Sequence, residues 1–269
     1  MRSKDGRTTK DGIRIYQEAD FAGMHAAGKL AAQILDDIAP HVFPGQTTGE
    51  IDRLITEMVE ASDATSATIG YKGYQHASCI SVNHVVCHGI PGDKKLKDGD
   101  IMNIDVTVIL DGWFGDTSRM YVAGKLSRKA ERLIQITHDA LMRGIEVVKP
   151  GNTFGDIGHA IQVFAESQRM SVVRDFCGHG LGRVFHAPPN VLHYGRSGTG
   201  PVLEEGMFFT IEPMINWGRP ETKVLADEWT AVTRDKSLSA QFEHSIGVTA
   251  DGFEIFTLSP GGKFHPTYG

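Results

Sequence analysis

The chain has little of several features that would assign it to a particular protein class. It has only three cysteines in 269 residues, and no two of them form a Cys-x-x-Cys pair. This pattern fits a reducing cytoplasm and argues against a disulfide framework or a cysteine zinc site. No apolar run approaches about 18 residues, so we expect no membrane span. The net charge is −6 and the pI is about 6.0, which excludes a chain that binds polyanions over its whole surface.

Positive charge is concentrated at the N-terminus, where Arg2, Lys4, Arg7 and Lys10 precede any periodic segment. This stretch lacks the apolar region of a secretory signal. We interpret residues 1–12 as a flexible, solvated basic arm. The alternative is a contact with nucleic acid or the ribosome.

Two internal repeats are the most informative feature that is present. Residues 96–105 and 203–212 share an aligned leucine, an aligned glycine and a final Ile-acid pair, at an offset of 107 residues. Residues 44–51 and 150–157 repeat a Pro-Gly-x-Thr pattern at an offset of 106. The length permits one large domain or two small ones. The repeats favour a single domain over 13–269, built from two similar halves of about 13–125 and 126–258.

Each half begins with helical patterns. Apolar residues recur at helical spacing over 20–39 and 127–148. The capping boxes Thr47–Glu50 and Thr153–Asp156 each predict the start of a further helix. Both halves therefore have the order helix, Pro-Gly, capped helix and strands.

Six segments have the character of strands. We expect them near 79–86, 101–110, 113–122, 207–215, 223–232 and 240–249. In 101–110 the residues alternate between an apolar face and a polar face that includes Asp105 and Thr107, which predicts a half-buried strand with helices over its apolar side.

Asp111-Gly112 is a strong signal for a two-residue hairpin turn. The turn predicts that Thr107 faces Asp116 and that Asp105 faces Ser118. The two acids then lie on one face as diagonal neighbours, about 7–8 Å apart at Cα, and can share a cation.

The acids of the hairpin recur in the second half. A solvated polar face would by itself explain Asp105 and Asp116. However, Glu212 takes the place of Asp105 in the repeat, and the surroundings of Glu243 resemble those of Asp116. Four carboxylates that converge in a cleft repel one another unless cations intervene. Their charge matches two divalent ions, and their oxygens suit Mg, Mn, Fe, Co or Zn.

Three histidines lie in settings that suit a site of this kind. His179 is flanked by Gly178 and Gly180, and these glycines would let the backbone pass close to a ligand. His88 and His186 are the other candidates. A single histidine is more often structural than a ligand. We rank His179 first as a ligand, but spacing does not separate the roles of the three.

Together these segments resemble a known family, the type I methionine aminopeptidases. The matching motifs extend from about residue 13 to 258 and form a specific ordered set. They are Asn83–Pro91, Ile104–Val106, Gly115–Ser118, Gly178–Gly180, Ile211–Pro213 and Gln241–His244. The segment between His179 and Glu212 is short and there is no zinc-finger extension, so the chain resembles the compact bacterial form.

The resemblance implies an α+β pita-bread fold, with pseudo-twofold symmetry and antiparallel sheets covered by helices around a dinuclear metal site. It implies two divalent ions, of Co, Mn, Fe or Zn, with Asp116 and Glu243 as the bridging ligands. The implied metal ligands are Asp105, Asp116, His179, Glu212 and Glu243. The implied contacts to the substrate near the scissile bond are His88 and His186. The implied pocket for the methionine side chain is lined by Tyr71, Tyr74, Cys79, Phe185 and Trp229. Packing in the core would also explain Phe185 and Trp229.

The implied reaction is removal of the N-terminal methionine by a metal-activated water, with a preference for a small second residue. Glu212 would move the proton, His186 would stabilise the oxyanion and His88 would face the scissile nitrogen. Ala187 departs from the acid found in many relatives, which bears on the second and third substrate positions. We expect a cytoplasmic monomer that acts on nascent polypeptides and contacts the ribosome transiently.

Two other functions remain as alternatives. The first is a proline-directed peptidase of the same fold, whose members usually have an additional N-terminal domain, whereas only a short arm precedes the first helix here. The second is a non-enzymatic peptide-binding protein of the same fold, a class that typically loses metal ligands.

Overall fold

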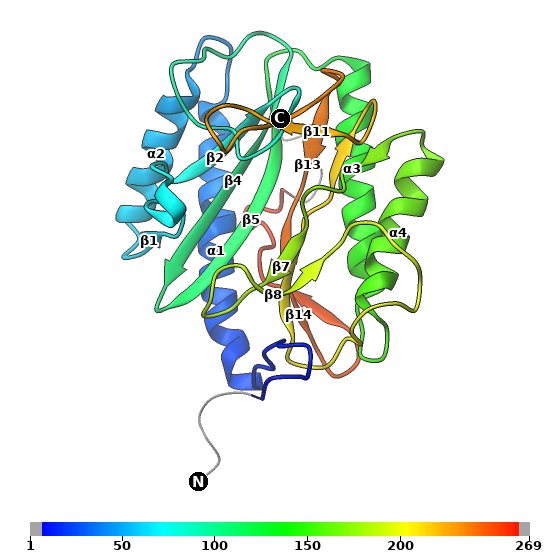
Figure 1. The fold of residues 1–269 in the computed structure, drawn as a ribbon. Coiled ribbons are helices and arrows are strands. Elements are labelled where there is room, and N and C mark those ends of the chain that lie inside the picture. The colour runs from blue at the N-terminus through cyan, green and yellow to red at the C-terminus, as the bar shows by residue number, and fades with distance from the viewer. Residues whose placement is uncertain (1–6, 264–269) are drawn as a thin grey trace.

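The computed structural model of the chain describes residues 7–263, and its helices lie behind its strands in the view of Figure 1. Helix α1 (Glu18–Ile38) and helix α2 (Thr48–Glu60) come first in the chain, on one side of the molecule. Helix α3 (Arg128–Glu146) and helix α4 (Phe154–Ser167) come later, on the other side. The predicted order of helix, capped helix and strands therefore occurs twice.

The two predicted capping boxes differ in the structure. The amide and the hydroxyl of Thr153 both donate to Asp156 Oδ2, at 2.7 and 2.8 Å. Thr47 Oγ1 accepts from the Glu50 amide at 3.1 Å, but the Thr47 amide donates to the side chain of Gln46. Glu50 bonds to Arg53 instead. The first box therefore has only one of its two hydrogen bonds. The bond from the Thr47 amide to the Glu50 carboxylate is missing, because the amide bonds to Gln46 and the carboxylate bonds to Arg53.

All the strand pairings within residues 7–263 are antiparallel. Before α3 the strands are β1 (Thr65–Ser66), β2 (Ser78–Val82), β3 (Val85–Cys87), β4 (Asp100–Leu110) and β5 (Trp113–Ala123). After α4 they are β6 (Ser171–Val172), β7 (Gly178–Gly180), β8 (Ala187–Val191), β9 (Phe208–Ile211), β10 (Met214–Asn216), β11 (Thr222–Val224), β12 (Ala231–Thr233), β13 (Ser239–Gln241), β14 (His244–Val248) and β15 (Phe253–Ile255). The short 3-10 helices are η1 (Ala39–His41) and η2 (Tyr71–Gly73).

The strands of the described part of the chain form four sheets. Strand β4 pairs with β5 along one edge and with β1 and β2 along the other. The other sheets have the orders β13-β10-β6, β11-β12-β3 and β15-β14-β9-β7-β8. The pairing of Cys87 with Ala231, and of Val85 with Val232, joins an early strand to a late one.

Two expected strands, those of the hairpin, are continuous, and the other four are each divided in two. The breaks fall at 83–84, 212–213, 225–230 and 242–243. Pro213 has no amide hydrogen to continue a ladder, which accounts for the second break. The break at 242–243 separates two sheets, because β13 pairs with β10 and β14 pairs with β9.

The register of the β4–β5 hairpin is as predicted. Thr107 lies opposite Asp116 and Asp105 lies opposite Ser118. The prediction of a half-buried strand was wrong, because Asn103 and Thr107 on the polar face are buried as well. This face packs against the later strands, and Asn103 Nδ2 donates to the carbonyl of Gln241 at 2.8 Å. The acids of the hairpin therefore lie at a junction inside the molecule.

Helices cover the opposite, apolar face of the hairpin. Ile104, Val106 and Val108 are fully buried against α1 and α2. A side chain at Gly115 would collide with the carbonyl of Ala27 on α1, so this glycine permits the close packing. Helices α3 and α4 cover a second apolar core under the later strands.

Part of the predicted basic arm lies within the described residues. The amide of Ile15 donates to the carbonyl of Arg7 at 2.7 Å, and Arg7 forms an ion pair with Glu204. Residues 7–12 thus fold back on the following segment, whereas residues 1–6 lie outside the described part of the chain. No helix within residues 7–263 is long and apolar enough to cross a bilayer.

Candidate active site

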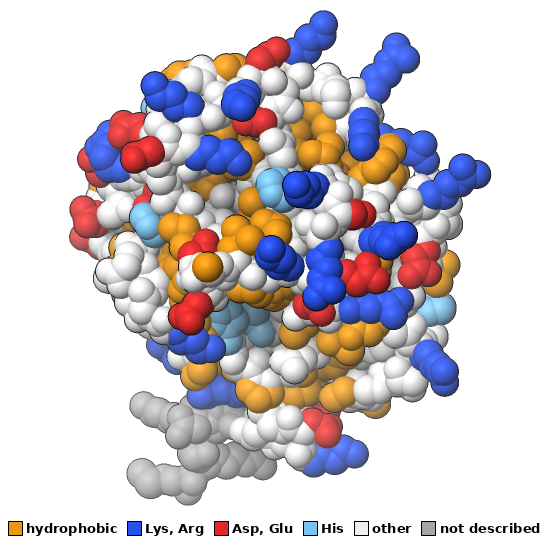
Figure 2. All heavy atoms as spheres, turned by 45° about the horizontal axis from the view of Figure 1, so that its top comes forward, with side chains coloured by type: hydrophobic (Ala, Val, Ile, Leu, Met, Phe, Trp, Pro, Cys, Tyr) orange, Lys and Arg blue, Asp and Glu red, His pale blue; other side chains and the backbone are white. Residues whose placement is uncertain are grey.

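One cavity of about 360 Å³ lies where the hairpin meets the later strands. In Figure 2, imidazoles lie in a hollow among hydrophobic side chains on one face of the molecule. Every residue predicted for the site lines the cavity. These residues are Tyr71, Tyr74, Cys79, His88, Asp105, Asp116, His179, Phe185, His186, Glu212, Trp229 and Glu243. The fold therefore brings together side chains that are up to 172 residues apart in the sequence.

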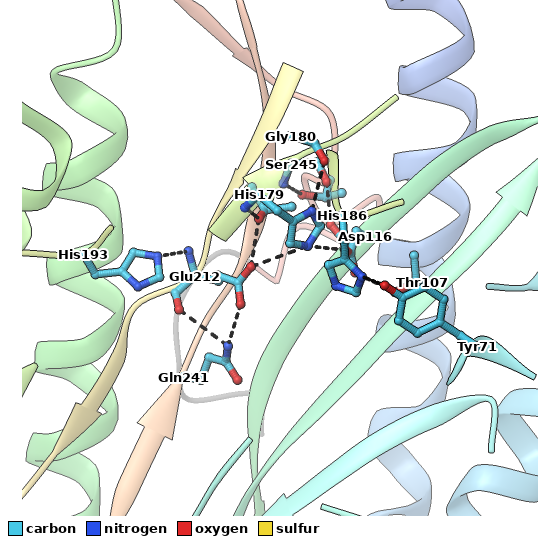
Figure 3. A network of polar contacts seen from close by, with 12 residues as sticks. Tyr71, Thr107, Asp116, His179, Gly180, His186, His193, Glu212, Gln241 and Ser245 are labelled. Carbon is cyan, nitrogen blue, oxygen red and sulfur yellow. Dashed lines mark hydrogen bonds and ion pairs between the residues drawn. The ribbon is translucent and has the colours of Figure 1, made fainter. Parts of the chain in front are cut away.

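The centre of the cavity is a cluster of potential metal ligands. One ligand atom from each of Asp116, His179 and Glu243 lies within 4.8 Å of the other two. His179 Nε2 is 3.4 Å from Asp116 Oδ2 and 3.7 Å from Glu212 Oε1 (Figure 3). These side chains come from β5, β7 and the breaks that follow β9 and β13.

The glycines beside His179 have a different role from the one expected. A Cβ at Gly178 would collide with the carbonyl of Thr210, and a Cβ at Gly180 would collide with the carbonyl of Pro188. The space is therefore taken by the neighbouring strands β9 and β8, and the close backbone approach is not to a ligand. The glycines fix His179 indirectly, because they allow β7 to lie tightly between the two strands.

Threonines orient the acids of the cluster. Thr107 Oγ1 donates to Asp116 Oδ1 at 2.7 Å across the hairpin. Thr210 Oγ1 donates to Glu212 Oε1 at 2.8 Å and accepts from the His179 amide at 3.0 Å. Thr210 therefore links the candidate histidine ligand to Glu212.

Two further contacts to Glu212 were not expected from the sequence. Gln241 Nε2 donates to Glu212 Oε2 at 3.2 Å, and the Glu212 amide donates to His193 Nε2 at 3.1 Å (Figure 3). Burial lowers the pKa of His193 to about 3. Gln241 could have been found by its place two residues before Glu243. No motif points to His193.

Burial and mutual repulsion dominate the electrostatics of the acids. Burial raises the pKa of Asp105 well above its usual range, and the charges of Asp116 and Glu212 raise it further. The pKa of Glu243 is raised well above its usual range for the same reasons. Burial raises the pKa of Glu212 to about 7, although the nearby His179 opposes the shift. Burial alone would lower the pKa of His179, but Asp116 and Glu212 raise it above its ordinary value.

These properties test whether the residues fit a metal site. Four acids and an imidazole share the cavity, and burial disfavours the negative charge of Asp105, Glu212 and Glu243. Divalent cations would remove this penalty, since carboxylate and imidazole are ligands that Mn, Fe, Co and Zn all accept. The side chains present therefore fit divalent metal.

His88 and His186 line the cavity in strained backbone conformations. Their φ angles are +55° and +56°, in the left-handed region that residues other than glycine rarely adopt. Such strain, which costs about 1–3 kcal/mol per residue, is concentrated at functional sites. Burial lowers the pKa of His88 below its ordinary value. Partial burial, together with the charge of His179, lowers the pKa of His186 to about 4, so both imidazoles are neutral at neutral pH.

His186 has a specific partner across the cavity mouth. Its Nδ1 lies 2.7 Å from the hydroxyl of Tyr71. A neutral imidazole that accepts this hydroxyl hydrogen at Nδ1 carries its own proton on Nε2. Nε2–H is then left as a donor that can face a substrate.

Aromatic side chains line the rest of the cavity. The ring centroids of Tyr74 and Trp229 are 4.9 Å apart, and Trp229 lies 6.0 Å from His88. Phe185 stacks on His186 at 3.8 Å. Phe185 and Trp229 are only partly buried, and Phe185 also packs against the core cluster that contains Trp113 and Leu181, so it belongs both to the cavity wall and to the core. All three cysteines of the chain also line this cavity.

Comparison with known proteins connects this geometry to a family. The sequence model of metallopeptidase family M24 matches residues 22–250. The chain is 60% identical over 257 residues to a methionine aminopeptidase of Rickettsia prowazekii (strain Madrid E), covering 95% of this chain and 99% of the relative. It is 53% identical to a methionine aminopeptidase of Escherichia coli (strain K12), over 91% of this chain and 94% of the relative.

Solved structures agree with the sequence relatives. The crystal structure of the R. prowazekii methionine aminopeptidase has a TM-score of 0.91 and 61% identity, covering 91% of this chain and all of that one. A prolidase from Pyrococcus furiosus has a TM-score of 0.73 at 20% identity, covering 91% of this chain and 65% of that one, and shows the shared fold alone. The expected pita-bread fold and the expected resemblance are thereby confirmed. The chain belongs to metallopeptidase family M24 and, within it, to the group of the bacterial methionine aminopeptidases.

Proposed function

We propose that this chain removes the N-terminal methionine from nascent proteins and peptides, with a preference for a small second residue. The observation that carries the proposal is that Asp105, Asp116, His179, Glu212 and Glu243 line one cavity together with aromatic side chains, with Asp116, His179 and Glu243 close enough to share an ion. The high identity to methionine aminopeptidases along nearly the whole chain supports it.

The five candidate ligands would hold two divalent ions, of Co, Mn, Fe or Zn. When bound, the ions lower the pKa of a water molecule and polarise the scissile carbonyl. Asp116 and Glu243 are the candidates to bridge the ions. The role of Thr107 would be to keep the Asp116 carboxylate turned toward His179.

The chain's own residues would perform the remaining steps. Glu212 accepts a proton from the attacking water at a carboxylate oxygen and delivers it to the leaving amine. His186 donates Nε2–H to the oxygen that gains negative charge, and Tyr71 keeps that tautomer. His88 faces the scissile nitrogen. The free N-terminal amine of the substrate is attracted by the acidic cluster, which would favour exopeptidase cleavage.

The pocket for the methionine side chain would be lined by Tyr71, Tyr74, Cys79, Phe185 and Trp229. The thioether of methionine packs well against aromatic edges, as the rings of this cavity permit. Burial raises the pKa of the Cys79 thiol, and so does the nearby Asp105, which leaves an uncharged wall next to the substrate.

The proposal extends to the protein as a whole. We propose that residues 13–269 form one catalytic domain of two pseudo-symmetric halves, with the division near residue 125. The chain would act as a cytoplasmic monomer on nascent polypeptides, with transient contact to the ribosome.

The decisive experiment measures free methionine released from Met-Ala-Ser by the metal-free chain and by the chain loaded with Co, Mn, Fe or Zn. An X-Pro peptide is the control, because the prolidase shares the fold. We expect metal-dependent release from Met-Ala-Ser alone. Cleavage of only the X-Pro peptide, or no release with any metal, would contradict the proposal.

A further inference from the structure

The backbone of Glu212 lies at a gap between strands. The ladder between β9 and β14 ends at the pair Ile211–His244, and Pro213 follows Glu212 directly. At the other acid that lies in a strand break, Glu243, the amide donates to the carbonyl of Ser118 on β5, at 3.1 Å. The Glu212 amide donates instead to an imidazole, Nε2 of His193, at 3.1 Å (Figure 3).

The chemical state of His193 follows from this contact. The amide brings a hydrogen to Nε2, so Nε2 presents its lone pair and the ring proton lies on Nδ1. The side chain is 0% exposed, and its Nδ1 has no hydrogen-bond partner among the described residues. A buried donor without a partner costs about 1–3 kcal/mol. An apolar residue would avoid this cost, so packing alone does not explain a histidine here.

This contact acts on Glu212, whose carboxylate has several side-chain partners in the cluster. The Glu212 carboxylate meets Thr210, Gln241 and His179 through its two oxygens. These contacts depend on where the backbone places Cα. The imidazole takes the place of the strand carbonyl that is missing at the gap, and thereby fixes that position.

We propose that His193 is a positioning residue that holds the Glu212 backbone so that its carboxylate faces His179 and the divalent cations. This inference rests on the proposed function, because it takes Glu212 to be a ligand and a proton carrier. The ligands whose binding depends on His193 are therefore divalent cations.

The test compares His193→Met with His193→Gln, which have side chains of similar length. The carboxamide oxygen of glutamine can accept the amide hydrogen near the position of Nε2, whereas methionine offers no strong acceptor. Val191→Ala is the control, since Val191 is buried on the same segment and shortening it removes packing alone. Isothermal titration of the metal-free proteins with Mn²⁺ gives the affinity, and release of methionine from Met-Ala-Ser gives kcat and KM.

We expect His193→Met to lose about 10- to 100-fold in Mn²⁺ affinity and in kcat, the usual effect of removing a group that orients a ligand. KM should change little, because the cavity walls are intact. His193→Gln should recover most of both losses, and Val191→Ala should lower the unfolding temperature while Mn²⁺ affinity and kcat stay unchanged.

Wild-type Mn²⁺ affinity and kcat in folded His193→Met would overturn the proposal, and so would equal losses in the two His193 variants. If His193→Met does not fold by circular dichroism, His193→Gln decides, because it must keep Mn²⁺ affinity close to that of the wild type. Failure of the proposed function is a separate result, in which the wild type binds Mn²⁺ but releases no methionine.

Discussion

The bond between Tyr71 and His186 makes a sharp prediction about the reaction. The Tyr71 hydroxyl lies 2.7 Å from His186 Nδ1, and the two rings are 5.1 Å apart. Tyr71→Phe removes this hydroxyl and keeps the ring, so it tests the tautomer of His186 separately from the shape of the pocket.

The size of the effect follows from the environment of the bond. A hydrogen bond of this kind contributes about 0.5–1.5 kcal/mol, which corresponds to a loss of about 2- to 12-fold in kcat. His186 is exposed, so water can replace part of the hydroxyl's effect, and we expect the lower part of that range. His186→Ala removes the oxyanion donor itself and should cost about 100- to 1000-fold.

The assay is steady-state hydrolysis of Met-Ala-Ser, with kcat and KM determined separately. Tyr74→Phe is the matched control, because the Tyr74 hydroxyl donates to the Ser78 carbonyl, away from His186. If Tyr71 acts through His186, Tyr71→Phe has no further effect in the His186→Ala background. A loss that is fully additive in the double variant, or a change in KM alone, would refute the reasoning and leave Tyr71 as a pocket wall.

Four further changes test the site and the fold. Glu212→Gln should lower turnover by about 100- to 10,000-fold with an unchanged circular dichroism spectrum, and full activity with saturating metal would contradict its role in proton transfer. Asp105→Asn should lower the metal content measured by elemental analysis; an unchanged content would remove it from the ligand set. Phe185→Ala should reduce the preference for Met over Leu at the first position by about 10-fold, measured as a ratio of kcat/KM values. Asp36→Asn should cost about 3–5 kcal/mol of unfolding free energy at pH 7, because it leaves the buried Arg119 without its charged partner.

The buried pair of Asp36 and Arg119 also predicts a pH dependence. Burial alone would raise the pKa of Asp36, but hydrogen bonds from Arg119, Gly261 and Ser259 outweigh it and hold the pKa below its ordinary value. The stabilisation is therefore complete above the unfolded pKa of about 3.9 and is lost as the pH falls through the lower folded value. Urea unfolding should show the wild type and Asp36→Asn converging in that acidic range, and a constant difference down to pH 2 would exclude the linkage.

Much of the site could be predicted because its signals are local. The Asp111-Gly112 turn sets the register of the hairpin, and this places Asp105 and Asp116 on one face without any tertiary information. The repeat then points to Glu212 and Glu243. Helices were predictable for the same reason, since their apolar spacing and capping threonines lie within a few residues of one another.

The features that were missed depend on contacts between distant segments. Asn103 and Thr107 on the polar face of β4 are buried because later strands pack on that face, and alternation alone does not distinguish it from a solvated one. The left-handed backbone conformation of His88 and His186 could not be predicted, because no local sequence pattern indicates a positive φ angle at a residue other than glycine. His193 lies 19 residues before Glu212, and only the fold brings its imidazole to that amide.

The two pairs of acids are held in different ways, although the repeat makes them look equivalent. Asp105 and Asp116 lie within continuous strands, where the ladder satisfies their backbone groups. Glu212 and Glu243 lie at strand breaks, where each amide needs a partner from elsewhere. A break frees the carboxylate to turn into the cavity, but it also removes the ladder that would hold it in place. Glu212 therefore depends on added contacts from His193, Thr210 and Gln241, whereas the backbone of Glu243 is held by Ser118 and Thr117 of β5. Substitutions at these contacts should disturb metal binding more than the sequence repeat alone would indicate.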